Sequence, residues 1–195
     1  GGVEGLLGHK NITLVRGKAS FKDQHTVVVD GEEYSADYII IATGSVSASL
    51  PIAGVDLPGV ITSKEILDID EVPQRLCVIG GGVIGLEFAS IFRSFGSEVT
   101  VLEYCKDILP RFDTDLAKRL KQSLSKKGIE INTQAQVTSV AEKSGEYTVS
   151  YTRKGKEESV VADKVLMAVG RRANIGSLNL SDAGIEFTGR GVVVN

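Results

Sequence analysis

A glycine-rich segment between an apolar run and an amphipathic stretch constrains the fold more than any other feature of this 195-residue chain. Residues 76–79 are apolar throughout, as expected of a strand that is buried on both faces. Gly80, Gly82 and Gly85 then follow in G-x-G-x-x-G spacing, and apolar residues recur at helical spacing after them. This context predicts a dinucleotide-binding turn, with Gly80 allowing the tight bend, Gly82 allowing a pyrophosphate to approach the backbone, and Gly85 allowing close helix–strand packing.

Glu103 supplies the second part of this pattern. It ends the next expected strand, 23 positions after Gly80, where the dinucleotide-binding pattern places an acidic residue about 20 positions on. A carboxylate there accepts hydrogen bonds from the adenosine ribose hydroxyls. It also repels a 2′-phosphate, by about 4 kcal/mol at 4 Å and an effective dielectric of 20 before further screening. We therefore expect NAD rather than NADP, although Lys106 could swing toward the phosphate and Glu103 could be an ordinary exposed strand end.

Alternating strands and helices around this turn predict an α/β fold. One helix follows the turn and is closed by Gly96, and a second is capped by Asp113 and ended by Gly128. Three segments then alternate like an antiparallel meander, with turns near 144–145 and 154–155, before a last buried strand. The expected strands are residues 76–79, 98–103, 129–131, 136–142, 146–153, 157–162 and 164–169. The apolar helical positions are Ile84, Phe88, Ile91, Phe92 and Phe95, and then Leu116, Leu120 and Leu124, which are expected to face inward.

The segment before the glycine turn is expected to be mostly β structure. Residues 38–42 are apolar throughout and predict a strand buried on both faces, and residues 45–60 read as a connection. Thr62 and Ser63 are expected to cap a short helix over residues 64–67. The other expected strands are residues 12–16, 26–30 and 33–34.

Composition and charge exclude several classes of partner. The net charge is −3 with acids and bases mixed, so neither nucleic acid nor a membrane is an expected partner. The basic cluster over residues 118–127 reads as a solvated helix face. Two histidines without metal-ligand spacing predict no metal site. Cys77 and Cys105 lie far apart, which fits a reducing compartment and a cytoplasmic location. Because the only methionine is Met167, we expect the chain to begin inside a longer reading frame, which leaves organellar targeting open.

No constellation of residues predicts independent catalysis. A Tyr-x-x-x-Lys pair and a Cys-x-x-x-x-Cys pair are both absent, and His9 and His25 suggest no Ser–His–acid arrangement. The chain therefore has a predicted place for a hydride-carrying dinucleotide and no group of its own to exchange the hydride, so we predict no catalytic residue.

Several segments resemble dihydrolipoamide dehydrogenases of the pyridine nucleotide-disulfide oxidoreductase family. Residues 76–89, 96–103 and 108–113 resemble the NAD-binding segment of that family. Residues 42–45 resemble its flavin-side A-T-G motif, and residues 170–172 resemble the start of its G-R-R-P motif. Ala173 stands where the proline usually follows, and residues 189–195 resemble the strand that returns to the flavin domain. The resemblance covers essentially the whole chain, in the family's order.

The resemblance implies a Rossmann-like FAD/NAD(P)-binding fold with an antiparallel β-meander crossover. Residues 1–48 would be part of an FAD-binding domain, residues 49–171 the NAD-binding domain, and residues 172–195 a return segment toward the FAD domain. It also implies the cofactor contacts. Glu87 could instead be a helix-surface acid, and Val137 could be simple core. The implied NAD contacts are Gly80, Gly81, Gly82, Val83, Ile84, Gly85, Glu87, Glu103, Val137 and Gly170. The implied FAD contacts are Gly17, Lys18, Thr43, Gly44 and Ser45.

The reaction implied for the full-length enzyme is dihydrolipoamide plus NAD⁺ giving lipoamide plus NADH. This chain alone is expected to be inactive, because the redox cysteine pair, most of the FAD site and the His–Glu pair of the family are absent. The implied partners are the remainder of the flavoenzyme, its homodimer mate and a 2-oxoacid dehydrogenase complex. Without those partners, apolar surface around residues 12–45 and 185–195 should be exposed, favouring self-association or domain swapping. The alternatives are another NAD-linked flavoprotein disulfide reductase and a non-catalytic dinucleotide-binding module.

Overall fold

The computed structural model describes all residues 1–195, and they form two compact units. The first unit comprises Gly1–Val46 and Arg172–Asn195, and the second comprises Ser47–Arg171. The chain therefore passes from one unit to the other twice. Assigning the units to FAD and NAD stays a prediction. No helix of the chain is both long enough and apolar enough to cross a membrane.

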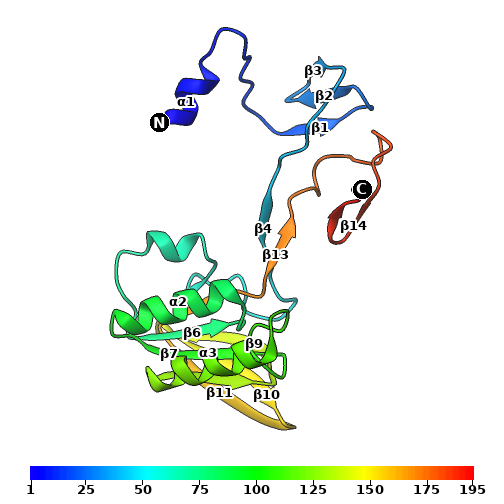
Figure 1. Cartoon of the computed structure of the whole chain (residues 1–195). Coiled ribbons are helices and arrows are strands. Elements are labelled where there is room, and N and C mark those ends of the chain that lie inside the picture. Colours follow the sequence, from blue (N-terminus) through cyan, green and yellow to red (C-terminus); the bar gives the residue numbers. More distant parts are fainter. The chain divides into compact units, whose positions relative to one another are not determined.

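A parallel five-stranded sheet that includes β6 and β7 forms the centre of the second unit (Figure 1). Its strand order is β5-β12-β6-β7-β8. Its middle strand, β6, is the apolar run before the glycine turn and pairs in parallel with β12 and β7. This arrangement confirms the predicted α/β class. The bounds are β5 Val60–Ile61, β6 Arg75–Ile79, β7 Glu98–Glu103, β8 Ile129–Thr133 and β12 Lys164–Met167.

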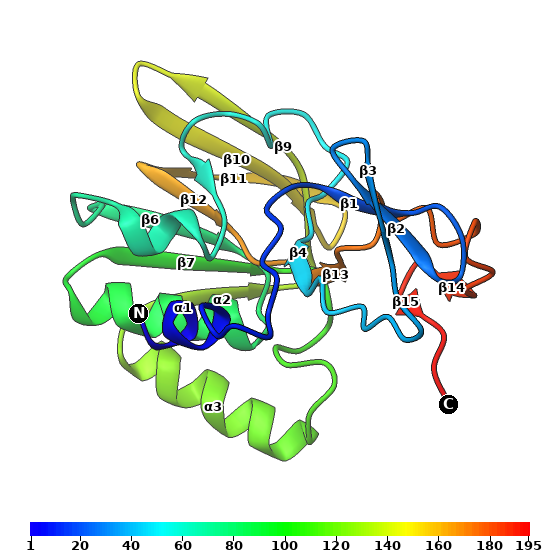
Figure 2. The same cartoon turned by 90° about the horizontal axis from the view of Figure 1, so that it is seen from above.

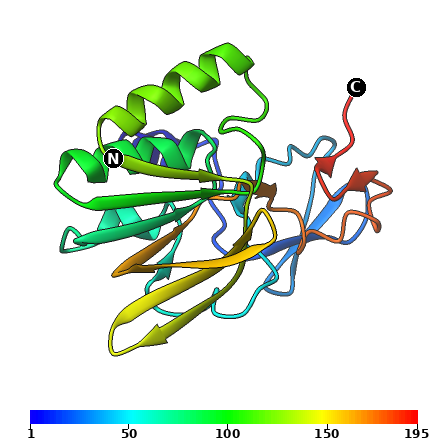
Figure 3. The ribbon, with the colours of Figure 1, turned by 90° about the horizontal axis from the view of Figure 1, so that it is seen from below.

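Both faces of this sheet are covered, which explains why its strands are apolar without alternation. Helices α2 (Val83–Ser94) and α3 (Thr114–Lys126) cover one face, and an antiparallel sheet of order β11-β10-β9 covers the other (Figures 2 and 3). Successive residues of β6 point to opposite faces, so Val78 belongs to the core under the helices and Cys77 to the core under the meander. The meander strands are β9 Ala135–Lys143, β10 Glu146–Arg153 and β11 Lys156–Ala162, as predicted within one or two residues.

The two helices begin and end as expected, but their buried faces are narrower than the sequence suggests. Asp113 Oδ1 accepts hydrogen bonds from the backbone N–H of Asp115 and Leu116, at 3.0 and 3.1 Å, which confirms the cap. The inward prediction for α3 is wrong for Leu116 and Leu120, which are exposed; only Leu124 is buried, together with Ala117. A small residue such as Ala117 allows the helix to approach the sheet closely, and the spacing of the large apolar residues does not reveal this.

Small residues also determine which face of α2 is buried. The core side consists of Gly85, Leu86, Ala89 and Phe92, whereas Phe95 is 64% exposed although it shares the helical spacing of the apolar residues. Before α2, the expected helix over residues 64–67 is a 3-10 turn, η1 (Glu65–Asp68).

The first unit is built around a three-stranded antiparallel sheet of β1 (Ala19–Phe21), β2 (Thr26–Val29) and β3 (Glu32–Ser35). Its small core consists of Phe21, Leu178, Leu180 and Ala183. The strand predictions for residues 12–16 and 38–42 are wrong. Within 38–42, Ile39 and Ile41 pack on that core, while Ile40 is 90% exposed. β-rich composition favours extended backbone, but a strand also needs a hydrogen-bonded neighbour, and these runs have none.

The remaining elements of the chain are short. They are α1 Gly2–Leu7, β1 Ala19–Phe21, β2 Thr26–Val29, β3 Glu32–Ser35, β4 Ser45–Ser47, β13 Arg171–Ala173, β14 Phe187–Thr188 and β15 Gly191–Val192. Exposed apolar surface in the first unit agrees with the prediction for residues 12–45 and 185–195. Its main contributors are Ile12, Leu14, Val15, Tyr38, Ile40, Phe187, Val193 and Val194.

One ion pair joins the starts of two central strands and predicts a pH dependence of stability. Asp163 accepts hydrogen bonds from the backbone N–H of Arg75 at 2.8 Å and from its guanidinium, and this partner lowers the pKa of the Asp163 carboxyl. A lowered pKa means that the stabilisation is complete above the ordinary value of 3.8 and is lost as the pH falls below it. We expect Asp163→Asn to cost about 1 kcal/mol at pH 7, with the deficit shrinking below about pH 4. Urea unfolding at several pH values, with exposed Glu157→Gln as control, measures this, and a deficit independent of pH would contradict it.

Candidate dinucleotide-binding site

The glycine turn connects β6 to α2 at the carboxyl end of the central strand. Gly80 has a φ of +113°, and a Cβ there would lie 2.4 Å from the carbonyl oxygen of Ala168. Its N–H donates to the carbonyl oxygen of Leu102, at 2.9 Å, so the turn is also held by the neighbouring strand β7. The positive φ and the close approach each require glycine, as predicted for the tight bend.

Gly85 and Gly82 differ in what surrounds them. A Cβ on Gly85 would lie 2.1 Å from the carbonyl oxygen of Gly80 and 3.1 Å from Val78 Cγ1, so the first turn of α2 packs directly against β6. A Cβ on Gly82 would meet nothing within 4 Å. Gly85 therefore serves packing, and Gly82 leaves open space beside the backbone at the start of the helix.

The start of α2 provides backbone hydrogen-bond donors beside that open space. Gly82 is the N-cap, and its carbonyl oxygen accepts the first helical hydrogen bond, from Leu86 N at 3.0 Å. The N–H groups of Val83, Ile84 and Gly85 precede that bond and have no partner within the helix. Together with the positive end of the helix dipole, they form an arrangement suited to a phosphate group.

Glu103 lies beside this turn and is buried, with 7% of its surface exposed. Its Oε2 accepts a hydrogen bond from Gly81 N at 2.6 Å, and its Oε1 accepts one from Cys105 N at 2.7 Å. The alternative of an ordinary exposed strand end is therefore wrong. Each carboxylate oxygen has a second lone pair, so Glu103 can still accept hydrogen bonds from a ribose. Its role in ribose binding stays a prediction.

Cys105 adjoins Glu103 and does not act as a thiolate at neutral pH. Burial raises the pKa of the Cys105 thiol, and the hydrogen bond to the Glu103 carboxylate raises it further. Burial likewise raises the pKa of the Cys77 thiol, well above its ordinary value. Both thiols therefore remain protonated and poorly nucleophilic.

The other predicted NAD contacts in this unit have different surroundings. Glu87 is exposed on α2, and Gly170 is exposed with a φ of +121°. Val137 is buried in the core under the meander, opposite Tyr151 of β10. That burial matches the alternative of simple core, and its packing against an adenine stays a prediction.

The predicted FAD contacts belong to the first unit. A Cβ on Gly17 would lie 2.4 Å from Val29 Cγ1, so this glycine packs directly against β2. The carbonyl oxygens of Thr43 and Gly44 accept hydrogen bonds from Asn174, at 3.2 and 3.0 Å. These contacts join the two sequence segments of the first unit. The roles of Lys18 and Ser45, and of the whole group, in binding FAD stay predictions.

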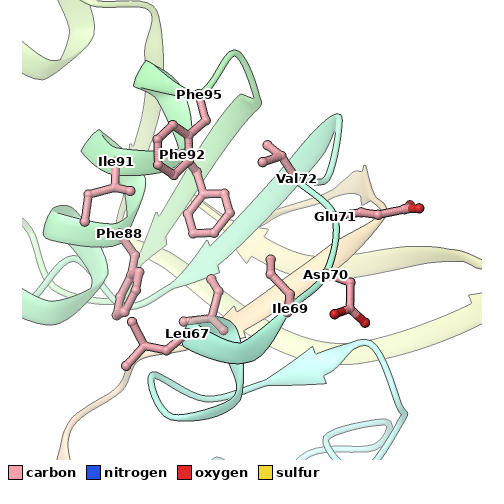
Figure 4. A pocket seen from close by; sticks show the side chains of 10 residues that line it. Leu67, Ile69, Asp70, Glu71, Val72, Phe88, Ile91, Phe92 and Phe95 are labelled. Carbon is pink, nitrogen blue, oxygen red and sulfur yellow. The ribbon is translucent and has the colours of Figure 1, made fainter.

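A separate apolar hollow of about 240 Å³ lies between η1 and the far half of α2 (Figure 4). Phe88, Phe92 and Phe95 line it from the helix, and Asp70 and Glu71 lie at its edge. The hollow extends along α2 from Phe88, roughly 8 Å of helix beyond the start of α2, to Phe95, and none of the residues of the glycine turn lines it. Its apolar walls and acidic edge do not suit a pyrophosphate, and the glycine turn remains the candidate site.

A family model described as pyridine nucleotide-disulphide oxidoreductase matches residues 1–195. Curated proteins named dihydrolipoyl dehydrogenase are similar over nearly the whole chain. The protein of Staphylococcus aureus is 41% identical over 197 residues, which cover 99% of this chain and 42% of that protein. That of Acholeplasma laidlawii is 38% identical over 198 residues, which cover 100% of this chain and 57% of that protein.

A solved structure shows the same fold. The HOCl-induced flavoprotein disulfide reductase RclA from Escherichia coli matches with a TM-score of 0.89 and 35% identity, over 99% of this chain and 44% of that chain. This chain therefore spans about two fifths to three fifths of the length of the proteins it matches.

Proposed function

Because the chain belongs to the pyridine nucleotide-disulphide oxidoreductase family, we propose that residues 47–171 bind NAD at the glycine turn between β6 and α2. One observation carries the proposal: the open backbone at Gly82, with the unpaired N–H groups at the start of α2, lies beside the buried carboxylate of Glu103. A dinucleotide presents an anionic pyrophosphate and ribose hydroxyls, and this site offers a partner for each.

Different residues would bind different parts of NAD. The N–H groups of Val83 and Ile84 would bind the pyrophosphate, and Glu103 would accept hydrogen bonds from the adenosine ribose. Val137 would pack near the adenine, and Glu87 and Gly170 would lie toward the nicotinamide. NAD supplies the hydride-accepting ring, and the protein's part is to hold and orient it.

The first unit would contribute to an FAD site in the whole protein. We assign Gly17, Lys18 and residues 43–45 to it, and the exposed apolar side chains of this unit to contacts with the rest of the flavoprotein. The proposed overall reaction is the oxidation of dihydrolipoamide by NAD⁺ through a disulfide and FAD. Its proposed setting is a cytoplasmic homodimer that serves a 2-oxoacid dehydrogenase complex. The similarity to dihydrolipoyl dehydrogenases supports this assignment.

A second candidate is an NAD-linked flavoprotein disulfide reductase with another substrate. The similarity to a flavoprotein disulfide reductase, at 35% identity, favours this candidate. Cys77 and Cys105 are free and are not spaced as a redox pair, so no residue of this chain selects between the two disulfide substrates.

Calorimetric titration of the chain with NADH and with NADPH tests the proposal. We expect NADH to bind and NADPH to bind about fivefold more weakly or worse, since even a quarter of the unscreened repulsion from Glu103 amounts to about 1 kcal/mol. Equal affinities would contradict the choice of NAD over NADP. Failure of both nucleotides to bind a chain that circular dichroism shows to be folded would contradict the site itself.

A further inference from the structure

We propose that the connection between β7 and α3, residues 104–112, is a positioning segment that sets the phosphate-binding turn in shape before any ligand arrives. It would do so through the peptide groups of one residue, Gly81. This inference rests on the proposed binding of a dinucleotide at that turn and assigns a role to residues outside the glycine pattern.

Gly81 is held at both of its backbone polar groups. Its N–H donates to Glu103 Oε2 at 2.6 Å, and its carbonyl oxygen accepts from Leu109 N at 2.9 Å. The other oxygen of Glu103 accepts from Cys105 N at 2.7 Å, so the same carboxylate also fixes the start of the connection. Gly81 is thus hydrogen-bonded within the protein, and the donors left for a pyrophosphate are those that follow it.

The connection is itself rigidly anchored where it meets Gly81. Ile108 is fully buried in the core under the helices, and its Cγ2 would lie 3.1 Å from a Cβ on Gly81. Leu109 is buried and has a φ of +49°, a backbone conformation that a leucine keeps only when its surroundings fix it. Its carbonyl oxygen accepts from Phe112 N at 2.9 Å, which closes a turn.

This arrangement predicts a particular pattern of ligand effects. A turn that is already ordered does not lose freedom when the pyrophosphate binds, so loosening its support lowers affinity. Every ligand with the same pyrophosphate should be affected by the same factor, including NADH, NADPH and ADP-ribose. A lost ribose contact would instead change the ratio between NADH and NADPH.

The substitution Ile108→Ala tests this, because it removes buried support from the connection and Ile108 is not itself one of the proposed ligand contacts. Leu124→Ala is the matched control: it removes the same number of carbons from the same core, on α3. We expect Ile108→Ala to lower the affinity for all three ligands by about tenfold and by a common factor. Ile108→Val should retain most of the affinity, and Leu124→Ala should change it by less than about twofold. The urea midpoint of each variant is measured as well, so that a loss of affinity is distinguished from a loss of stability.

Amide hydrogen exchange by NMR gives a second readout that needs no ligand. The N–H groups of Gly81 and Leu109 should be protected in the unmodified chain and lose protection in Ile108→Ala, but keep it in Leu124→Ala. Unchanged affinity and protection in a folded Ile108→Ala, or equal losses in both variants, would overturn the inference. If the unmodified chain binds none of the three ligands, the proposed site fails, while loss of Gly81 protection in Ile108→Ala would still identify the support.

Discussion

Replacing Gly85 with alanine is expected to destabilise the second unit by about 3 kcal/mol or more, the upper range for overpacking a core. The added Cβ would lie 2.1 Å from the carbonyl oxygen of Gly80, and a backbone atom cannot move aside as a flexible side chain can. Relief requires α2 to shift away from β6, which also displaces the N–H groups at the start of the helix. Urea unfolding followed by circular dichroism measures the loss.

Gly82→Ala is the informative comparison. Its Cβ would meet nothing within 4 Å, so the cost in stability should stay within about 1 kcal/mol, the difference between glycine and alanine as an N-cap. The same methyl group would occupy the space through which we expect a pyrophosphate to approach, so NADH affinity should fall by about tenfold or more. Stability losses of similar size in Gly82→Ala and Gly85→Ala would contradict the separate roles of the two glycines.

Glu103→Ala is expected to have the second large effect, lowering both stability and NADH affinity. It leaves the buried N–H of Gly81 and the partly buried N–H of Cys105 without their acceptor, at a combined cost of about 2–4 kcal/mol. Exposed Glu98→Ala on the same strand is the control and should stay within about 0.5 kcal/mol. Thermal unfolding and NADH titration of both variants measure these effects.

Glu103→Gln separates the two roles of this residue. Its amide oxygen can replace one acceptor but its NH₂ group cannot replace the other, so stability should be intermediate. Removing the negative charge should also narrow the preference for NADH over NADPH. A Glu103→Ala variant as stable as Glu98→Ala would contradict the structural role of the carboxylate.

The sequence was sufficient to predict the centre of this fold, because the centre depends on local patterns. An apolar run before the glycines predicts β6, and the spacing of Gly80, Gly82 and Gly85 predicts a turn whose geometry the structure shows. Asp113 and Gly128 mark the ends of α3 through interactions within a few residues. Each of these features is a property of neighbours along the chain.

Predictions that depended on distant neighbours were less successful. Residues 38–42 have the composition of a buried strand, but pairing and burial require partners that composition does not supply. Leu116 and Leu120 lie on the apolar side of α3, yet the sheet reaches only the side with Ala117 and Leu124. The two backbone hydrogen bonds of Glu103 were also missed, since spacing places a carboxylate near the turn without showing what it binds.

A crystal structure of the chain grown with NAD⁺ is the most direct test of the central claim. We expect pyrophosphate oxygens within hydrogen-bond distance of the N–H groups of Val83 and Ile84, and an adenosine ribose on Glu103, with the Gly81 hydrogen bonds unchanged. A dinucleotide bound elsewhere, such as in the apolar hollow beside Phe95, or bound at the turn without contact to Glu103, would contradict it.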